Sequence, residues 1–147
     1  MHHPRREVLD ERGRWSERTR QIVERDQLAS CMNATKWREL FLHVPPLPLG
    51  GAMRWIGEDA SSRDSHAWDV PEMLGACDRI EWIEFDPIEK QWVGALVGSR
   101  VVADHSERIL EILRRINAPT SLEAGRYRVW GYLRPGTAPA WVVPAPK

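Results

Sequence analysis

The sequence predicts an α+β fold, a small two-layer sandwich in which a mainly antiparallel sheet carries its helices packed on one face. Two segments, near 34–44 and 105–117, have the apolar spacing of amphipathic helices and polar residues at their starts. Four other segments, near 52–56, 65–69, 79–85 and 126–133, have strand-like composition. The length of 147 residues suits one domain that removes roughly 68% of its unfolded surface from water.

The first 31 residues form a segment of their own, with seven arginines and six acidic residues. Ser16 is a candidate cap for a helix that runs to about Ala29. Its apolar face would consist only of Ile22, Val23 and Leu28, which is too little for firm docking. We therefore predict a poorly ordered or helical extension over 1–31, a single α+β domain over 32–134 and a Pro-rich tail over 135–147.

The helix near 34–44 is specified at both ends. Asn33 is the predicted N-cap, and Pro45 and Pro46 end the helix because proline donates no backbone N–H. The positions i, i+3, i+4 and i+7 of its buried face are Trp37, Leu40, Phe41 and Val44.

The segment 79–85 is the predicted central strand. Ile80 and Trp82 should point to one face, and Ile83 and Phe85 to the other, so both faces should be covered. Farther along, residues 92–102 are apolar but contain two glycines, and we interpret them as a loop with one or two short strands.

The helix near 105–117 and the strand near 126–133 follow each other closely. Asp104 and Glu107 have the spacing of a capping box, and Pro119 follows the helix end. The predicted buried stripe consists of Ile109, Ile112, Leu113 and Ile116. The tail from Pro135 has four prolines in thirteen residues, which predicts extended backbone.

Composition argues against several classes of protein. No apolar run reaches the 18 residues of a membrane helix, and the first 30 residues lack a secretory signal, so we predict a cytoplasmic protein without membrane contact. Cys31 and Cys77 make no zinc motif and are predicted to be buried thiols. Eight tryptophans are expected to fill the core and its rim, with a surface for a ligand or partner as the alternative.

The net charge of zero conceals a segregation along the chain. Residues 58–89 hold ten acidic and two basic residues, a net of −8, whereas residues 100–134 have a net of +3. Either the two segments form different faces and the acidic one attracts a basic partner, or they pair across one sheet. The candidate partner-binding residues are Glu58, Asp59, Asp64, Asp69, Asp78, Glu81 and Glu84.

No catalytic or metal-binding set is predicted. Asp104, His105 and Ser106 are the residue types of a hydrolase triad, but consecutive residues at a helix start cannot line up as one. His43 and His66 lack a ligand-like repeat, and no phosphate-binding loop is present, so no cofactor is expected. Basic and aromatic residues alternate over 126–130, but the overall charge disfavours nucleic acid binding.

Short motifs resemble a family of small uncharacterised bacterial cytosolic proteins, a domain of unknown function. The opening Met-Asn-x-Thr-Lys-Trp of that family is matched at 32–37, and its strand of the form Ile-Glu-Trp-Ile/Leu-Glu-Ile is matched at 80–85, where this chain ends in Phe85. The Asp-His-Ser-Glu helix start is matched at 104–107, the Ile-Asn-x-Pro stop at 116–119 and the last strand at 129–132. The resemblance covers about 32–134. It implies an α+β fold, no established activity and Met32 as the natural start; by analogy with other orphan families it suggests an immunity protein.

We therefore predict a non-enzymatic protein-binding domain with a protein partner, one form of which is an immunity protein that neutralises a bacterial toxin through an acidic surface. Its oligomeric state is left open, as is a purely self-associating role. The alternative is a small enzyme whose site is assembled from His66, Asp69, Asp78 and Glu81.

Overall fold

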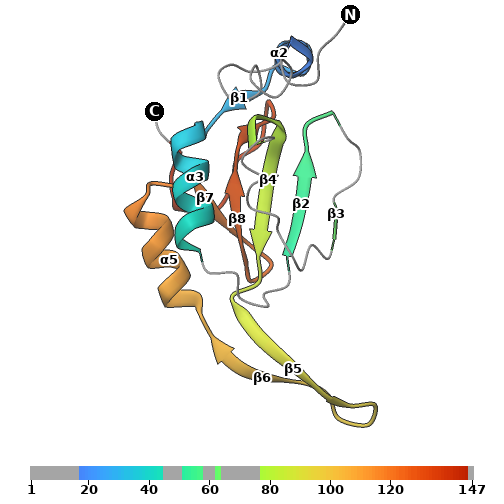
Figure 1. Ribbon diagram of the computed structural model, residues 1–147. Helices are drawn as coiled ribbons and strands as arrows, with labels where there is room; N and C mark the ends of the chain where they lie inside the picture. The colour runs from blue at the N-terminus through green and yellow to red at the C-terminus, as the bar shows by residue number, and fades with distance from the viewer. Residues whose placement is uncertain (1–16, 45–50, 58–61, 64–76, 146–147) are drawn as a thin grey trace, which may run out of the picture.

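The computed structural model describes residues 17–44, 51–57, 62–63 and 77–145 and has the predicted α+β fold. Figure 1 shows helices α3 and α5 side by side on one face of a sheet. The described strands of this sheet follow the order β10-β7-β8-β4-β2-β3, and every neighbouring pair is antiparallel. In chain order the elements are α2 (Glu17–Arg25), β1 (Ala29–Ser30), α3 (Ala34–His43), β2 (Gly51–Trp55), β3 (Ser62–Arg63), the 3-10 helix η1 (Cys77–Arg79), β4 (Ile80–Phe85), β5 (Ile88–Gly94), β6 (Gly98–Asp104), α5 (Ser106–Arg115), β7 (Thr120–Glu123), β8 (Arg126–Trp130), β9 (Tyr132–Leu133) and β10 (Trp141–Val143).

The predicted apolar faces of both helices meet the sheet. Trp37, Leu40 and Phe41 of α3 are buried with Ile109, Ile112 and Leu113 of α5, while Ile116 is only partly buried. The sheet contributes Met53, Ile83, Phe85, Tyr127 and Val129 to the same core. Asn33 caps α3 as predicted, because its side chain accepts the backbone N–H of Lys36 at 2.8 Å.

Strand β4 lies between β2 and β8, but its predicted alternation of faces is wrong at one end. Arg54 is opposite Trp82 and Trp55 is opposite Ile80, which leaves Glu81 as an extra residue. Because of this β-bulge, Ile80 lies in the core with Ile83, and Trp82 packs with Trp130 in a separate cluster.

Gly131 divides the predicted strand 126–133 into β8 and β9. Its N–H donates to the carbonyl of Glu81 at 2.7 Å, and a Cβ at this position would lie 2.1 Å from the carbonyl oxygen of Ile80. Only glycine permits so close an approach of two backbones. After Gly131 the chain leaves the sheet, and β9 pairs with β1 of the N-terminal segment.

The start of α5 differs from the predicted capping box by one residue. The N-cap is His105, which makes no side-chain capping bond, and the helix begins at Ser106. Asp104 accepts the N–H of Ser106 at 2.9 Å in place of the predicted bond from Glu107. An Asp side chain that accepts the backbone N–H of the residue two positions later forms an Asx turn. This turn starts the helix without the second, reciprocal hydrogen bond of a capping box.

Strands outside the predicted set join the sheet, and the helix predicted from Ser16 to about Ala29 is present as the shorter α2, although its apolar face was expected to be too small to dock. Strands β7 and β10 extend the sheet, β10 from the Pro-rich tail. Helix α2 contacts the body through Ile22 and Val23, which pack against Leu28, Ile56 and Tyr132. The predicted strand at 65–69 lies outside the described residues, and the proposed division of the chain at residues 31 and 134 stays a prediction.

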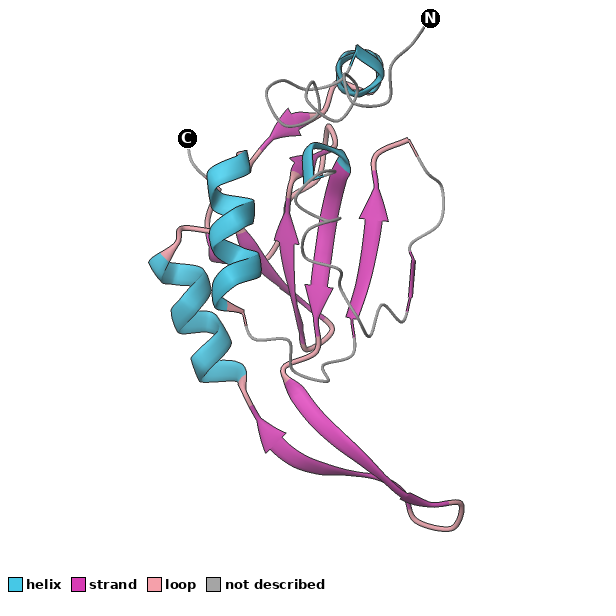
Figure 2. Cartoon of the chain, in the orientation of Figure 1, coloured by secondary structure: helices cyan, strands magenta, loops and turns pink. Residues whose placement is uncertain are grey.

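Strands β5 and β6 form a hairpin of their own. They pair with each other from Ile88 opposite Asp104 to Gly94 opposite Gly98. Figures 1 and 2 show this hairpin extending away from the two layers, where the sequence predicted a loop with short strands.

Candidate functional site

The seven predicted acidic residues divide into two groups. Glu58, Asp59, Asp64 and Asp69 lie outside the described residues. Asp78, Glu81 and Glu84 are described, and all three are buried. A buried carboxylate needs a partner, so the surroundings of these three residues decide whether they can meet another protein.

The Glu84 carboxylate is paired with arginines of the neighbouring strand. It lies opposite Arg128 in the register of β4 and β8, and the Arg128 Nε donates to it at 2.8 Å. Arg126 lies farther away, with 3.7 Å between its Nη1 and a Glu84 carboxylate oxygen. The Arg128 guanidinium also stacks over Trp82, 4.0 Å from the ring centroid, which adds a cation–π contact. These contacts between Glu84, its arginines and Trp82 stabilise the fold.

The Glu81 carboxylate is also paired with arginines. Its carboxylate accepts a hydrogen bond from Arg134 at 2.8 Å, and the Arg54 Nε lies 3.6 Å away. The bulge explains this pairing, because the extra residue in β4 turns the Glu81 side chain away from the core. Glu81 and Glu84 thus follow the alternative in which acidic and basic segments pair across one sheet.

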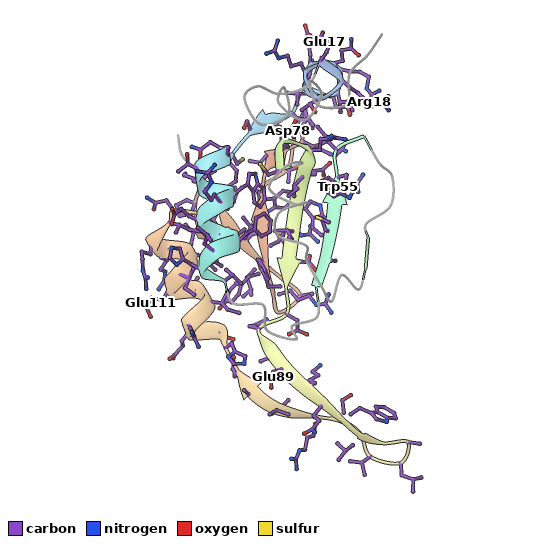
Figure 3. The ribbon with its side chains drawn as sticks, viewed as in Figure 1. Glu17, Arg18, Trp55, Asp78, Glu89 and Glu111 are labelled. Carbon is purple, nitrogen blue, oxygen red and sulfur yellow. The ribbon has the colours of Figure 1, made fainter. Side chains whose placement is uncertain are left out.

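Asp78 connects the sheet to the N-terminal segment. One carboxylate oxygen, Oδ2, accepts the hydroxyl of Thr19 at 3.0 Å, and the backbone carbonyl accepts the hydroxyl of Tyr132 at 2.6 Å. Burial, with the nearby Asp78 charge second, raises the pKa of Tyr132. Figure 3 places Asp78 at the end of the sheet nearest α2.

The residues of the alternative enzyme site are only partly described. Asp78 and Glu81 are held by different partners, Thr19 in one case and Arg134 in the other. His66 and Asp69 lie outside the described residues. The described half of this set therefore consists of two carboxylates engaged in separate structural contacts.

Asp104, His105 and Ser106 hold the base of the hairpin to α5. The hydrogen bonds from Ser106 lower the pKa of Asp104, and His105 Nε2 lies 3.3 Å from a carboxylate oxygen of Glu89 on the opposite strand. The backbone N–H of His105 donates to the carbonyl of Pro87 at 2.8 Å. All three residues thus fix the direction in which the hairpin leaves the body.

Both cysteines are free and buried, as predicted. Burial raises the pKa of the Cys77 thiol from its ordinary 9.0 to about 11 and also raises the pKa of Cys31. Because the thiolate is the reactive form, neither residue is suited to nucleophilic chemistry at neutral pH.

The hairpin carries the most exposed large apolar side chains of the described chain. Leu96 at its tip is fully exposed, and Trp92 and Val97 are exposed to 67% and 72%. Val93, Val101 and Val102 are exposed as well. In Figure 3 the hairpin side chains stand clear of the body, with Glu89 near the base. Such an apolar patch is a typical protein contact surface.

Sequence reasoning missed this surface because two glycines within 92–102 favour the prediction of a loop. Gly94 and Gly98 have φ of +141° and +77°, and they bound the tight turn of a hairpin. The sequence did contain a signal for a hairpin: an apolar segment in which two glycines are separated by three residues, the length of a short turn.

The fold and this surface define a small α+β domain with a projecting apolar hairpin and buried, ion-paired acidic residues. The chain belongs to a family of unknown function (DUF6678), whose model matches residues 19–136. The predicted membership in a family of unknown function is therefore confirmed, over a longer stretch than the expected 32–134. No curated protein and no solved structure matches the chain. No helix among the described residues has the length and apolar character needed to cross a membrane.

Proposed function

We propose that this protein is a non-enzymatic protein-binding domain whose binding element is the hairpin β5–β6. One observation carries the proposal: six large apolar residues are exposed on a projecting hairpin whose strands pair with each other. Burying such side chains against a partner contributes about 25 cal/mol per Å² of apolar surface. Lys90 and Arg100 flank the tip, so a partner with an apolar recess and acidic margins suits it.

A specific form of this proposal is an immunity protein that neutralises a bacterial toxin in the cytoplasm. Glu58, Asp59, Asp64 and Asp69 remain proposed partner contacts, since they account for much of the negative charge of 58–89. Asp78, Glu81 and Glu84 are left out of this acidic surface because they are buried.

The hairpin is tested by comparing partner capture by two forms of the full chain. The wild type and the double variant Trp92→Ser/Leu96→Ser are used as baits in lysate of the source cells, with quantitative mass spectrometry. We expect at least one protein to be retained by the wild type and lost by the variant. Leu42→Ser, on the exposed side of α3, is the matched control and should retain that protein. Equal recovery by all three baits would contradict the proposal.

The acidic residues are tested separately. Charge reversal at Glu58, Asp59 and Asp64 should weaken capture in low salt more than in high salt, because screening already removes the attraction at high ionic strength. Unchanged capture in low salt would remove the acidic surface from the interface.

A further inference from the structure

We propose that the hairpin meets its partner with one of its two faces, and that the partner presents a carboxylate that pairs with Lys90 beside the site that receives Trp92. The partner surface is then apolar, with an aspartate or glutamate set against it. This inference rests on the proposed function, because it names the chemistry that the same hairpin recognises.

The pairing of the two strands assigns side chains to the two faces of the hairpin. Between the register shifts at Glu89/Lys90 and at Trp92/Gly94, three consecutive pairs join β5 to β6: Lys90 with Val101, Gln91 with Arg100, and Trp92 with Ser99. Directly opposite residues point to the same side of a sheet, and successive residues point to opposite sides. One face therefore carries Lys90, Trp92 and Val101, and the other carries Gln91 and Arg100.

The face that carries Trp92 and Val101 is the apolar one, and we call it the Trp92 face. The two side chains are exposed to 67% and 61%. On the opposite face, Gln91 and Arg100 are polar and exposed. Removing apolar surface from water favours contact through the Trp92 face, whereas the polar face gains nothing by leaving water.

Lys90 is the charged residue of the Trp92 face. It is directly opposite Val101, which places their Cβ atoms about 5 Å apart, and it lies about 7 Å along the strand from Trp92. A partner that covers both apolar side chains therefore also covers the Lys90 stem and takes water from its ammonium group. An ammonium removed from water is unfavourable unless an opposite charge meets it.

The hairpin does not supply that opposite charge itself. No acidic residue occurs from residue 90 to residue 103. Glu89 precedes Lys90 on the strand and so points to the other side, where a carboxylate oxygen lies 3.3 Å from His105 Nε2. Asp104 accepts the backbone N–H of Ser106 at 2.9 Å. The carboxylate for Lys90 therefore comes from the partner, while Arg100 on the polar face stays in water.

A zero-length cross-link tests this contact. The probe is the protein that the wild-type bait retains and the Trp92→Ser/Leu96→Ser bait loses, held in complex with the full chain. A carbodiimide joins an amine to a carboxylate only where the two are in contact, and the chain has three lysines, Lys36, Lys90 and Lys147. We expect peptide mapping to show Lys90 joined to an aspartate or glutamate of the captured protein.

The matched control is the exchange variant Lys90→Arg/Arg100→Lys. It keeps both positive charges but moves the amine to the polar face. We expect it to bind the captured protein as the wild type does, because an arginine at position 90 can also pair with a carboxylate. No cross-link should form through its lysine at position 100.

Binding of the purified captured protein gives a second measurement. Lys90→Glu should weaken binding at least about tenfold, and Arg100→Glu less than about twofold, because only Lys90 is desolvated in the contact. Changing the cross-linked carboxylate residue of the captured protein to lysine should restore its binding to Lys90→Glu, since the two charges are then exchanged.

A cross-link through position 100 in the exchange variant would overturn the inference, as would equal weakening by Lys90→Glu and Arg100→Glu. A complex that needs Trp92 and Leu96 but forms no cross-link at Lys90 overturns the inference alone and leaves the proposed function in place. If the Trp92→Ser/Leu96→Ser bait loses no protein, the proposed function fails and this inference fails with it.

Discussion

Glu84 and Arg128 lie directly opposite each other on β4 and β8, and the guanidinium of Arg128 donates two hydrogen bonds to one Glu84 oxygen. The two residues belong to segments of opposite net charge that are far apart in the sequence. Their pairing turns an apparent acidic surface into a contact within the sheet.

Removing Arg128 should therefore destabilise the fold. We expect Arg128→Ala to lower the free energy of unfolding by about 3 kcal/mol, because the buried Glu84 carboxylate loses both hydrogen bonds from Arg128 and is left with Arg126, whose Nη1 lies 3.7 Å away. Urea unfolding measures this loss. The double variant Glu84→Gln/Arg128→Met should lose less than Arg128→Ala alone, since no uncompensated charge remains. If Arg128→Ala lost no more stability than an ordinary surface substitution, the Glu84–Arg128 pair would not stabilise the sheet as argued.

Gly131→Ala should destabilise the protein by about 1–3 kcal/mol, because its Cβ would collide with the backbone of Ile80 and separate β8 from β4. The control is Gly125→Ala. A Cβ at Gly125 meets nothing within 4 Å, but its φ of +80° costs about 1 kcal/mol for any other residue. Thermal unfolding of both variants separates collision from backbone strain. Equal losses would mean that the sheet accommodates the added methyl group.

Thr19→Val should loosen α2 without unfolding the sheet. The substitution keeps the shape of the side chain but removes the hydroxyl that donates to the buried Asp78 carboxylate, at a cost of about 1–3 kcal/mol. Hydrogen exchange should accelerate over residues 17–25 and remain slow in β4. Thr35→Val, on the exposed side of α3, provides the control. Uniform acceleration across the chain would instead mean that α2 and the sheet open together.

Stability should fall at alkaline pH because of Cys77. Its pKa in the folded protein, about 11, is above the ordinary 9.0, so the unfolded chain releases the proton first. The stabilising contribution is present below pH 9.0, is lost as the pH rises towards 11 and amounts to about 2 kcal/mol. Tyr132 acts in the same direction at higher pH. Urea unfolding from pH 8 to 11 measures the slope.

The variant Cys77→Ala, which removes the thiol, isolates this contribution. Its stability should decrease less steeply over the same pH range, since the remaining dependence comes from other groups. Parallel curves for the variant and the wild type would show that the Cys77 thiol does not control the alkaline loss.

The sequence by itself determined the two core helices and the class of fold. Their apolar residues recur at helical spacing, and the Asn33 cap is a contact between neighbours in the chain. Such local patterns are visible in any sequence because they depend on residues three or four positions apart. The central strand at 80–85 was also predictable, as was the burial of both cysteines.

Only the tertiary structure decided the state of the acidic residues and the place of the exposed surface. The bulge at Glu81 depends on the register between β2 and β4, and the partners of Glu81 and Glu84 come from residues about 50 positions later. No spacing within one segment encodes such pairings. The hairpin β5–β6 was missed for a related reason: apolar residues usually indicate a core, and only their position beyond both layers shows that they face solvent.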